Sequence, residues 1–408
     1  MAGISRLGAS GFLALVMVLA ACTSSTVGSD QSSTAASTDT TTANTESPSA
    51  GTSSIGVDAW ATFRFDAERT GSSNSEVELS SAEELWRFDT GGVVESSPAV
   101  VDGVVYAGTF NNTLFALDAS TGQVRWSFPV GGLVRASPSV VDGRVFFGAD
   151  DDLFYAVDAQ SGEELWRFEL GGGGEQSSPA VVDGVVYFGG FDNVVYALDA
   201  ESGEEVWRFE TGAGILSSPL VADGVVAIGS IDSIFYGLDA QTGDELWRVQ
   251  TGRSIFSSGA LIPADVSPNG APAVVFGSDD GSITAVNLAN GEPLWSVQTQ
   301  GPVFATAAVA DGVVYISSRD GSFQAIDAGS GETAWSIDLT EVLSSAAISG
   351  NRIFVGSSDG NLYILDTADG SEVDAISVGE LVWTSPAVID DHLFFGAHDG
   401  NLRGYALD

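Results

Sequence analysis

Short apolar runs separated by polar turn residues repeat along the chain from residue 85 to its end. In the unit 96–128, four such runs are divided by Asp102-Gly103, Asn111-Asn112 and Ser120-Thr121-Gly122, which are typical of tight hairpin turns. No stretch shows the sustained 3.6-residue apolar period of a helix. Each unit is therefore predicted to be one four-stranded antiparallel sheet.

Tryptophan marks the period of the repeat, with successive spacings of 40, 40, 41, 40, 48 and 40 residues. The residues so spaced, expected to dock neighbouring sheets together, are Trp86, Trp126, Trp166, Trp207, Trp247, Trp295 and Trp335. Four strands in about 40 residues is typical of a propeller blade. Eight expected first strands lie at Pro98, Pro138, Pro179, Pro219, Gly259, Ala307, Ala346 and Pro386. The predicted fold is all-β, an eight-bladed β-propeller of four-stranded antiparallel blades.

The two ends of the repeat region are incomplete in complementary ways. The last copy, Ser385–Asp408, has only three expected strands, whereas Leu85–Asp89 is a fourth strand with no first three before it. Together the fragments make one blade. We therefore expect the N-terminal strand to pair into the last blade and close the ring, which removes an exposed sheet edge.

The first residues have the pattern of an export signal. Arg6 precedes a short apolar run at 12–21, too brief for a membrane span, and small residues precede Cys22. This pattern resembles the bacterial lipobox, which implies signal peptide 1–21 and diacylation of the Cys22 thiol, although an ordinary secretory signal is the alternative.

Residues 22–55 are dominated by Ser, Thr, Ala and Gly and predict a flexible, lipid-anchored linker. A segment at 56–84 then leads into a propeller at 85–408. We expect an exported protein held to the membrane by its lipid, on the periplasmic side of an outer membrane or on the cell surface.

The charge of the chain is strongly one-sided. Asp and Glu total 55 against 14 basic residues, all arginine, for a net charge of -41. Such a surface repels phosphate backbones and anionic lipid headgroups, which excludes nucleic acid as a partner. Solubility in a salty habitat explains the acidity better than a specific cation-binding role.

A recurring segment carries a family resemblance. Ala116–Trp126, which returns in five later repeats, resembles the tryptophan-docking motif of the PQQ-type eight-bladed propellers. Trp60–Gly71 is similar to the opening segment of the same family. In the motif, glycine allows a tight turn, aspartate can bond the turn amides, and tryptophan is large enough to bridge two blades. One copy carries Asp374 in place of tryptophan, so that junction is expected to be looser.

The resemblance implies two kinds of function. Quinoprotein dehydrogenases of this fold hold pyrroloquinoline quinone and calcium in the central funnel, and the alcohol-oxidising members stack the quinone on a disulfide of adjacent cysteines. The BamB-like outer-membrane-protein assembly factors are not catalytic. Here Cys22 is the only cysteine and no C-x-x-C-H haem site is present.

We therefore expect a non-catalytic, monomeric scaffold that needs no cofactor and binds an envelope protein or peptide. A dehydrogenase using the quinone and calcium is one alternative, and a cell-surface propeller that binds another ligand is a second.

Residues that vary at one fixed position of the repeat are the candidate binding site. If the first strands are innermost, these side chains ring one mouth of the channel: Glu95, Arg135, Gln176, Leu216, Phe256, Phe304, Leu343 and Trp383. The last five form a contiguous apolar arc that would suit an extended or apolar peptide. The alternative is that all eight plug the funnel as core.

Other motifs give weaker signals. His392 and His398 are expected to be structural or exposed. Gly356–Gly360 matches G-x-S-x-G but falls at a hairpin, not at the strand-turn-helix of a nucleophile elbow. Gly171–Gly174 lacks the Lys-Ser/Thr of a phosphate loop and is interpreted as a connection between blades.

The one insertion in the repeat lies around residues 263–270 and accounts for the 48-residue spacing. Asp265, Ser267 and Asn269 place oxygen-bearing side chains at alternate positions before a glycine, a weak calcium-loop pattern. A plain turn is the favoured interpretation, because the full acidic set is missing.

Overall fold

The computed structural model describes residues 59–73, 82–174 and 176–407. The predicted signal peptide, Cys22 and the linker 22–55 lie outside these ranges. Every regular element in the described ranges is a β-strand. None of the described chain forms a helix long and apolar enough to cross a membrane.

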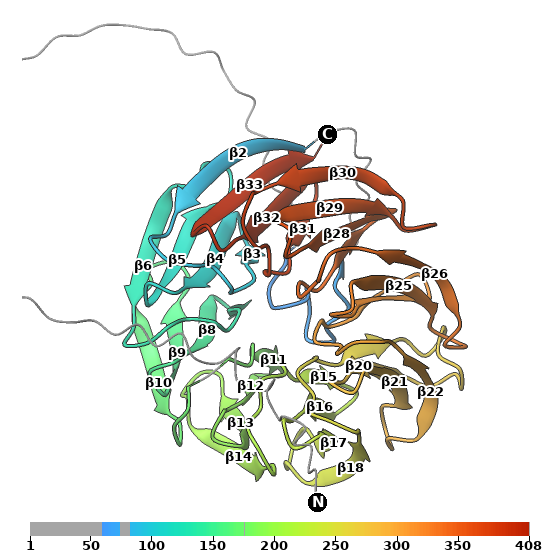
Figure 1. The fold of residues 1–408 in the computed structure, drawn as a ribbon. Helices are drawn as coiled ribbons and strands as arrows, with labels where there is room; N and C mark the ends of the chain where they lie inside the picture. The colour runs from blue at the N-terminus through green and yellow to red at the C-terminus, as the bar shows by residue number, and fades with distance from the viewer. Residues whose placement is uncertain (1–58, 74–81, 175, 408) are drawn as a thin grey trace, which may run out of the picture. The chain divides into compact units, whose positions relative to one another are not determined.

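Eight antiparallel sheets stand around a common axis, which confirms the predicted eight-bladed propeller (Figure 1). Blades 1 to 4, each given from the innermost strand outward, consist of β3 (Ala99–Val101), β4 (Val104–Thr109), β5 (Thr113–Asp118) and β6 (Val124–Pro129); β7 (Ser139–Val141), β8 (Arg144–Ala149), β9 (Leu153–Asp158) and β10 (Glu164–Glu169); β11 (Ala180–Val182), β12 (Val185–Gly189), β13 (Val194–Asp199) and β14 (Glu205–Glu210); β15 (Leu220–Ala222), β16 (Val225–Gly229), β17 (Ile234–Asp239) and β18 (Glu245–Gln250).

Blades 5 to 8 continue the ring. In the same order they consist of β19 (Ala260–Ile262), β20 (Ala273–Gly277), β21 (Ser282–Asn287) and β22 (Pro293–Gln298); β23 (Ala308–Ala310), β24 (Val313–Ser317), β25 (Ser322–Asp327) and β26 (Thr333–Asp338); β27 (Ala347–Ser349), β28 (Arg352–Gly356), β29 (Asn361–Asp366) and β30 (Glu372–Ser377); β31 (Ala387–Ile389), β32 (His392–Gly396), β33 (Asn401–Leu407) and β2 (Ala82–Asp89). A short fifth strand, β1 (Ser72–Ser73), pairs in parallel with β27 on the inner edge of blade 7.

Burial differs systematically between the inner and outer strands. The second strands are buried along all or nearly all of their length, as in β16 with its sequence VVAIG. They are packed on both faces by neighbouring blades, so they need continuous apolar residues. The outermost strands, such as β10 with its sequence ELWRFE, alternate between exposed and partly buried residues because one face meets water.

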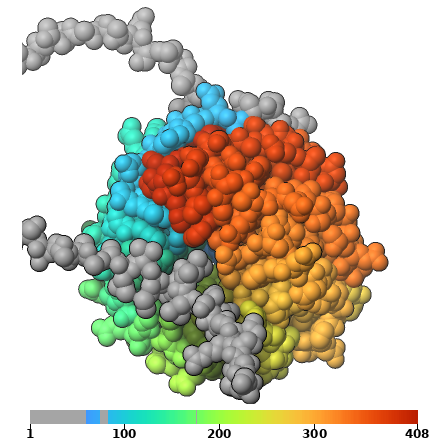
Figure 2. Space-filling view, viewed as in Figure 1, coloured from blue at the N-terminus to red at the C-terminus, as the bar shows by residue number. Residues whose placement is uncertain are grey.

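The two ends of the propeller meet in blade 8, as predicted. β2 pairs antiparallel with β33 from Ala82–Leu407 to Asp89–Asn401, and begins three residues before the predicted start at Leu85. In Figure 2 the blue N-terminal strand lies directly against the red C-terminal sheet. The ring is therefore closed by hydrogen bonds between the first and the last strand of the propeller.

Seven tryptophans join consecutive blades by the same contact. Each indole N–H donates to a backbone carbonyl at the turn between the second-last and last strands of the next blade, at 2.7 to 3.2 Å. The glycine of that turn has a positive φ, 66° at Gly122, and a side chain there would meet the indole of Trp86 at 2.7 Å. Glycine is thus required for both the turn and the close approach.

Asp374 replaces the tryptophan at the junction between blades 7 and 8, and the topology explains why. The last two strands of blade 8, β33 and β2, come from opposite ends of the chain, so no hairpin turn joins them to receive an indole. The junction is still continuously packed, because Phe354 and Ile376 of blade 7 and Phe394 of blade 8 belong to one buried cluster. This packing does not support the expected looseness.

We expect Trp207→Ala to lower the free energy of unfolding by about 3–5 kcal/mol, the usual cost of removing a buried aromatic side chain. Asp374→Trp should give no gain, because blade 8 offers its indole no docking turn. Denaturant titration followed by circular dichroism would measure both. Stabilisation by Asp374→Trp comparable to the loss at Trp207 would contradict this account of the junction.

The docking turns also hold a repeated aspartate. Asp199 Oδ1 accepts the amide N–H groups of Glu201 and Ser202 at 3.1 and 2.8 Å, and Asp158 makes the equivalent bonds. Hydrogen bonds from Ser202 and Ser161 lower the pKa of these two carboxyls below the usual 3.8. In blade 5 the amide of Asn287 makes the same turn without a titrating group.

A lowered folded-state pKa means that these carboxylates stabilise the fold fully above about pH 4 and lose that contribution as the pH falls through their folded values. We expect the double variant Asp158→Asn with Asp199→Asn to have a melting temperature near the wild-type value at pH 7. Between pH 4 and 2 its melting temperature should fall less than that of wild type. The control pair is Asp338→Asn with Glu169→Gln, which changes two exposed acids at strand ends outside such turns. Equal acid sensitivity in all three proteins would refute the assignment.

Candidate functional site

A segment formed by residues 59–73, called here the axial segment, crosses the centre of the ring (Figure 1). Backbone N–H groups of the innermost strands donate to its carbonyl oxygens at 2.7 to 3.0 Å. The pairs are Val100 to Trp60, Val140 to Ala61, Val221 to Ala67, Leu261 to Glu68, Val309 to Thr70 and Ile348 to Gly71. The axial segment thus satisfies inner sheet edges in six of the eight blades.

Two arginines of the axial segment, Arg64 and Arg69, are completely buried on the axis. Their guanidinium groups donate to the carbonyl oxygens of Ala307, Ala346, Pro219, Ser178 and Phe63. Burial lowers the pKa of each arginine to about 9, which leaves both charged at neutral pH. This role was not predicted from the sequence, because charged side chains are rarely buried.

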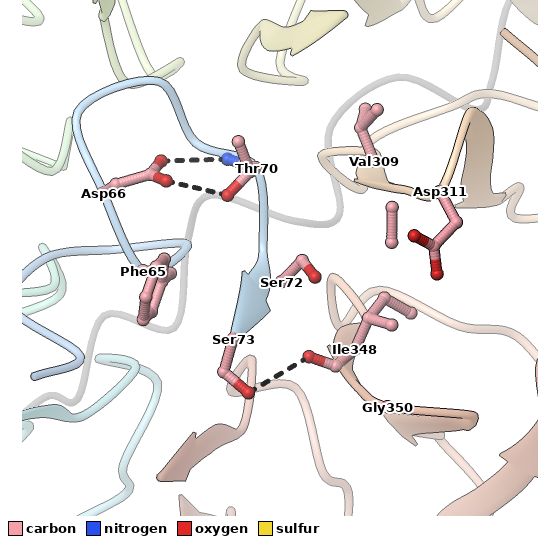
Figure 3. A pocket seen from close by; sticks show the side chains of 10 residues that line it. Phe65, Asp66, Thr70, Ser72, Ser73, Val309, Asp311, Ile348 and Gly350 are labelled. Atoms are coloured by element: carbon pink, nitrogen blue, oxygen red, sulfur yellow. Dashed lines mark hydrogen bonds between the residues drawn. The ribbon is translucent and has the colours of Figure 1, made fainter. Parts of the chain in front are cut away.

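A cavity of about 460 Å³ lies between the axial segment and blades 6 and 7, at the carboxyl ends of the innermost strands (Figure 3). Its acids are Asp66 and Asp311. Both carboxylate oxygens of Asp66 are already bonded to Thr70, through its N–H at 3.0 Å and its hydroxyl at 2.8 Å. Burial raises the pKa of Asp66. This carboxylate therefore holds the axial segment in shape.

The opposite end of the channel is lined by a closed ring of hydroxyl groups, called here the hydroxyl ring. In each blade the backbone N–H of one Ser or Thr donates to the side-chain oxygen of its counterpart in the next blade, at 2.8 to 3.2 Å. The members are Ser97, Ser137, Ser178, Ser218, Ser258, Thr306, Ser345 and Ser385. The last bond, from Ser385 N to Ser97 Oγ at 2.9 Å, completes the circle.

All eight candidate binding residues surround the same cavity of about 180 Å³, called here the mouth. They are Glu95, Arg135, Gln176, Leu216, Phe256, Phe304, Leu343 and Trp383. The hydroxyl ring and Phe63 of the axial segment complete its lining. Each of the eight side chains is partly exposed. The eight side chains are thus neither fully buried nor fully exposed, and the axial segment lies in the channel below them.

The apolar arc of the mouth contains aromatic contacts. Phe256 and Phe304 pack edge to face with ring centroids 4.8 Å apart, and the guanidinium of Arg319 lies 5.1 Å from the Phe304 ring. Trp383 donates its indole N–H to Ser358 Oγ at 3.1 Å. The arc is thus held in a fixed arrangement while remaining open to solvent on one side.

The polar side of the mouth is a chain of ion pairs. Arg135 Nε lies 2.9 Å from Asp150 Oδ2, and Arg135 Nη1 lies 3.3 Å from Glu95 Oε2. His398 Nε2 is 3.4 Å from the other oxygen of Glu95, and its ring lies 4.4 Å from that of Trp383. The network joins blades 8, 1 and 2 across the closure of the ring. Arg135 is therefore shared between the two acids of this network.

Asp150, Arg319, Ser358 and His398 belong to a second ring that the sequence analysis missed. In each blade a residue one or two positions after the second strand's end donates its N–H to the loop before the mouth residue. The members are Phe110, Asp150, Phe191, Ile231, Asp279, Arg319, Ser358 and His398. Their constant position in the repeat is the signal that would have identified them.

The remaining sequence candidates lie outside the mouth or serve the fold. His392 is buried, with Nδ1 2.6 Å from Asp391 Oδ1. Gly356–Gly360 forms the hairpin between β28 and β29. Gly172, Gly173 and Gly174 have φ values of 116°, 93° and 78°, and Gly174 N donates to Asp152 Oδ1 at 2.8 Å.

In the calcium candidate, Asn269 Oδ1 accepts hydrogen bonds from Ser267 Oγ and from the N–H of Ala271, while Asp265 is exposed. Nowhere in the described chain do three or more His, Cys, Asp or Glu side chains cluster as metal ligands would. The three side chains of this loop are therefore arranged as a turn.

The fold and its docking motif define a PQQ-like eight-bladed β-propeller closed by both ends of its chain. The chain belongs to the family described as the β-propeller of the beta-alanine-activating enzyme, whose model matches residues 74–312. A model described as outer membrane protein assembly factor BamB matches residues 262–407. The curated proteins contain no significant match to the chain.

Solved structures share the fold at low sequence identity. Quinohemoprotein alcohol dehydrogenase from Comamonas testosteroni is 16% identical with a TM-score of 0.75, over 87% of this chain and 81% of that one. BamB from Moraxella catarrhalis is 18% identical with a TM-score of 0.70, over 80% and 100%. The computationally designed Ika8 protein is 21% identical with a TM-score of 0.70, also over 80% and 100%. These similarities establish the fold alone.

The residues at the mouth do not fit a quinone with calcium. A cavity of about 180 Å³ is smaller than the roughly 300–1,000 Å³ of sites that enclose a small molecule. Glu95 and Asp150, the acids nearest the mouth, are both paired with Arg135. At the other end of the channel, Asp66 is bonded to Thr70. Three of the acids at the two ends, Glu95, Asp150 and Asp66, are thus already bonded to other protein groups.

We expect purified protein titrated with pyrroloquinoline quinone and calcium to show no saturable change in absorbance and no oxidation of alcohols or sugars. The reason is that the mouth is too small and its acids are already paired. A soluble quinoprotein dehydrogenase treated in the same way is the positive control. Saturable binding accompanied by substrate oxidation would reverse this conclusion.

Proposed function

We propose that this protein is a non-catalytic, lipid-anchored propeller of the cell envelope that holds a protein partner at the mouth. The observation that carries the proposal is the apolar arc of Leu216, Phe256, Phe304, Leu343 and Trp383, which is contiguous, partly exposed and placed at one end of the axis. Exposed apolar surface of this kind typically marks a binding site.

The size of the mouth favours a protein partner over a free small molecule. Its cavity of about 180 Å³ is deep enough for one inserted side chain, and the surrounding rim, which includes the exposed Phe191, widens the contact surface. Interfaces commonly centre on one large side chain placed in a pocket. A partner protein would bury both the cavity and the arc around it.

The outer edges of the blades are poor sites for adding a partner's strand. In all eight blades the pairing of the outermost strand shifts by one residue just before the docking position, as at Leu165 and Val206. Such bulges interrupt the regular edge that an incoming strand needs. Ion pairs such as Arg208 with Glu205 add charge to these edges. The blade edges therefore leave the mouth as the favoured surface.

The charge of the protein supports the same assignment. A chain with net charge -41 repels other acidic surfaces, whereas five of the eight residues around the mouth are apolar and Arg135 lies between Glu95 and Asp150. The mouth is thus a largely apolar surface on an acidic body. The match to the BamB model supports a role in outer-membrane protein assembly where an outer membrane exists. A bacterium without that membrane would use the mouth for a cell-surface partner.

The test is capture of envelope proteins after cross-linking in cells, comparing wild type with Phe256→Asp plus Trp383→Asp. The expected result is that proteins cross-linked to wild type are lost from this variant by at least about tenfold, because charge is introduced at the centre of the contact. Leu165→Asp with Leu246→Asp, which alters two exposed outer-strand residues, is the matched control and should capture the same proteins as wild type.

Identical capture by the mouth variant and wild type would remove the mouth from the interface. Loss of partner capture in the outer-strand control alone would indicate that the partner binds at the blade edges. Circular dichroism melting of each variant verifies that it is folded.

A further inference from the structure

The hydroxyl ring has an unused hydrogen-bonding capacity. Each of its eight oxygens accepts an amide N–H, but across residues 59–73, 82–174 and 176–407 none of the eight hydroxyls donates its own proton to another protein group. In contrast, the neighbouring Ser217 Oγ donates to Gly229 O at 2.8 Å. A buried hydroxyl normally finds an acceptor in protein, water or ligand. The base of the mouth is therefore suited to an acceptor group.

Charge limits what that acceptor group can be. Arg64 and Arg69 carry positive charge on the axis beyond Phe63, which opposes a cation at the base of the mouth. Glu95 at the mouth and the net charge of -41 oppose an anion. Because both a cation and an anion are disfavoured, a neutral polar group at the end of a side chain costs the least free energy to bury there.

The apolar walls of the mouth determine which kind of side chain can pack inside it. Five of its eight residues form the apolar arc, with the paired rings of Phe256 and Phe304 at its middle. An aromatic ring can pack edge to face or offset against such rings. Leucine or phenylalanine would fill the space but leave the hydroxyl ring without an acceptor, and the tryptophan indole offers only a donor. The tyrosine hydroxyl both accepts and donates.

We infer that the mouth binds a tyrosine side chain of the partner protein, with its ring against the apolar arc and its phenol oxygen on the hydroxyl ring. This inference rests on the proposed function and specifies the chemistry of the partner's central contact. Tyrosine is also among the residue types most enriched at the energetic centres of protein interfaces.

The direct test uses two matched probes, N-acetyl-tyrosinamide and N-acetyl-phenylalaninamide, which differ by one hydroxyl. Ligand-observed NMR titration should show the tyrosine probe binding about fivefold more tightly, the factor that one net hydrogen bond supplies. Equal affinity, or tighter binding of the phenylalanine probe, would overturn the inference.

Variants of the hydroxyl ring test whether it causes the preference for the tyrosine probe. Ser218→Ala with Ser258→Ala should abolish the preference for the tyrosine probe and leave the phenylalanine probe unchanged. The control is Ser161→Ala, an exposed turn position outside the mouth. A preference that persists in the double alanine variant would refute the role of the hydroxyl ring.

The alanine pair also removes acceptors for the Ser178 and Ser218 amides, so it can unfold the protein. In that case Ser218→Thr with Ser258→Thr serves instead, because Thr306 already occupies the equivalent position in blade 6. The added methyl groups narrow the mouth and should weaken both probes severalfold. Unchanged binding of both probes would contradict their placement in the mouth.

The outcomes separate this inference from the proposed function. If partner capture is lost in Phe256→Asp with Trp383→Asp but the two probes bind equally, the mouth binds a protein through a different side chain. If the tyrosine probe is preferred and lost with the hydroxyl ring while partner capture is unaffected by the same aspartates, the tyrosine site stands and the protein-holding role falls.

Discussion

The hydrogen bonds between β2 and β33 join the two ends of the propeller into one sheet, and every other feature of the ring depends on them. Without this pairing blade 8 would have three strands and an open edge. The hydroxyl ring closes only because blade 8 returns to blade 1, where Ser385 meets Ser97. The same return brings His398 next to Glu95, so the polar side of the mouth also depends on closure.

The axis of the propeller has two unlike ends. At one end the axial segment supplies Arg64 and Arg69, whose charges are held by backbone carbonyls. At the other end the mouth remains open above Phe63. The axial segment occupies the channel between these two ends and is bonded to six of the eight innermost strands. It gives the mouth a fixed base, and a preorganised surface needs less ordering when it binds.

The acidic surface and the bulged outer strands together limit where another protein can bind to this one. Charge keeps the body soluble and repels unspecific contacts, and the bulges protect eight exposed sheet edges from pairing with other chains. The family of the beta-alanine-activating enzyme propeller and the fold shared with BamB and the alcohol dehydrogenases show how one architecture hosts different functions. In this chain the residues of the mouth carry the function we propose.

Local patterns in the chain were enough to predict the number of blades, the hairpin turns, the docking tryptophans and the eight positions around the mouth, because each repeat encodes its own short-range hydrogen bonds and apolar runs. The two incomplete ends also predicted closure. The folded structure was needed to show that Arg64 and Arg69 are buried, that His398 lies next to Glu95, and that the hydroxyl ring is closed. These features arise between residues far apart in the chain, where no local pattern specifies which groups will be desolvated together.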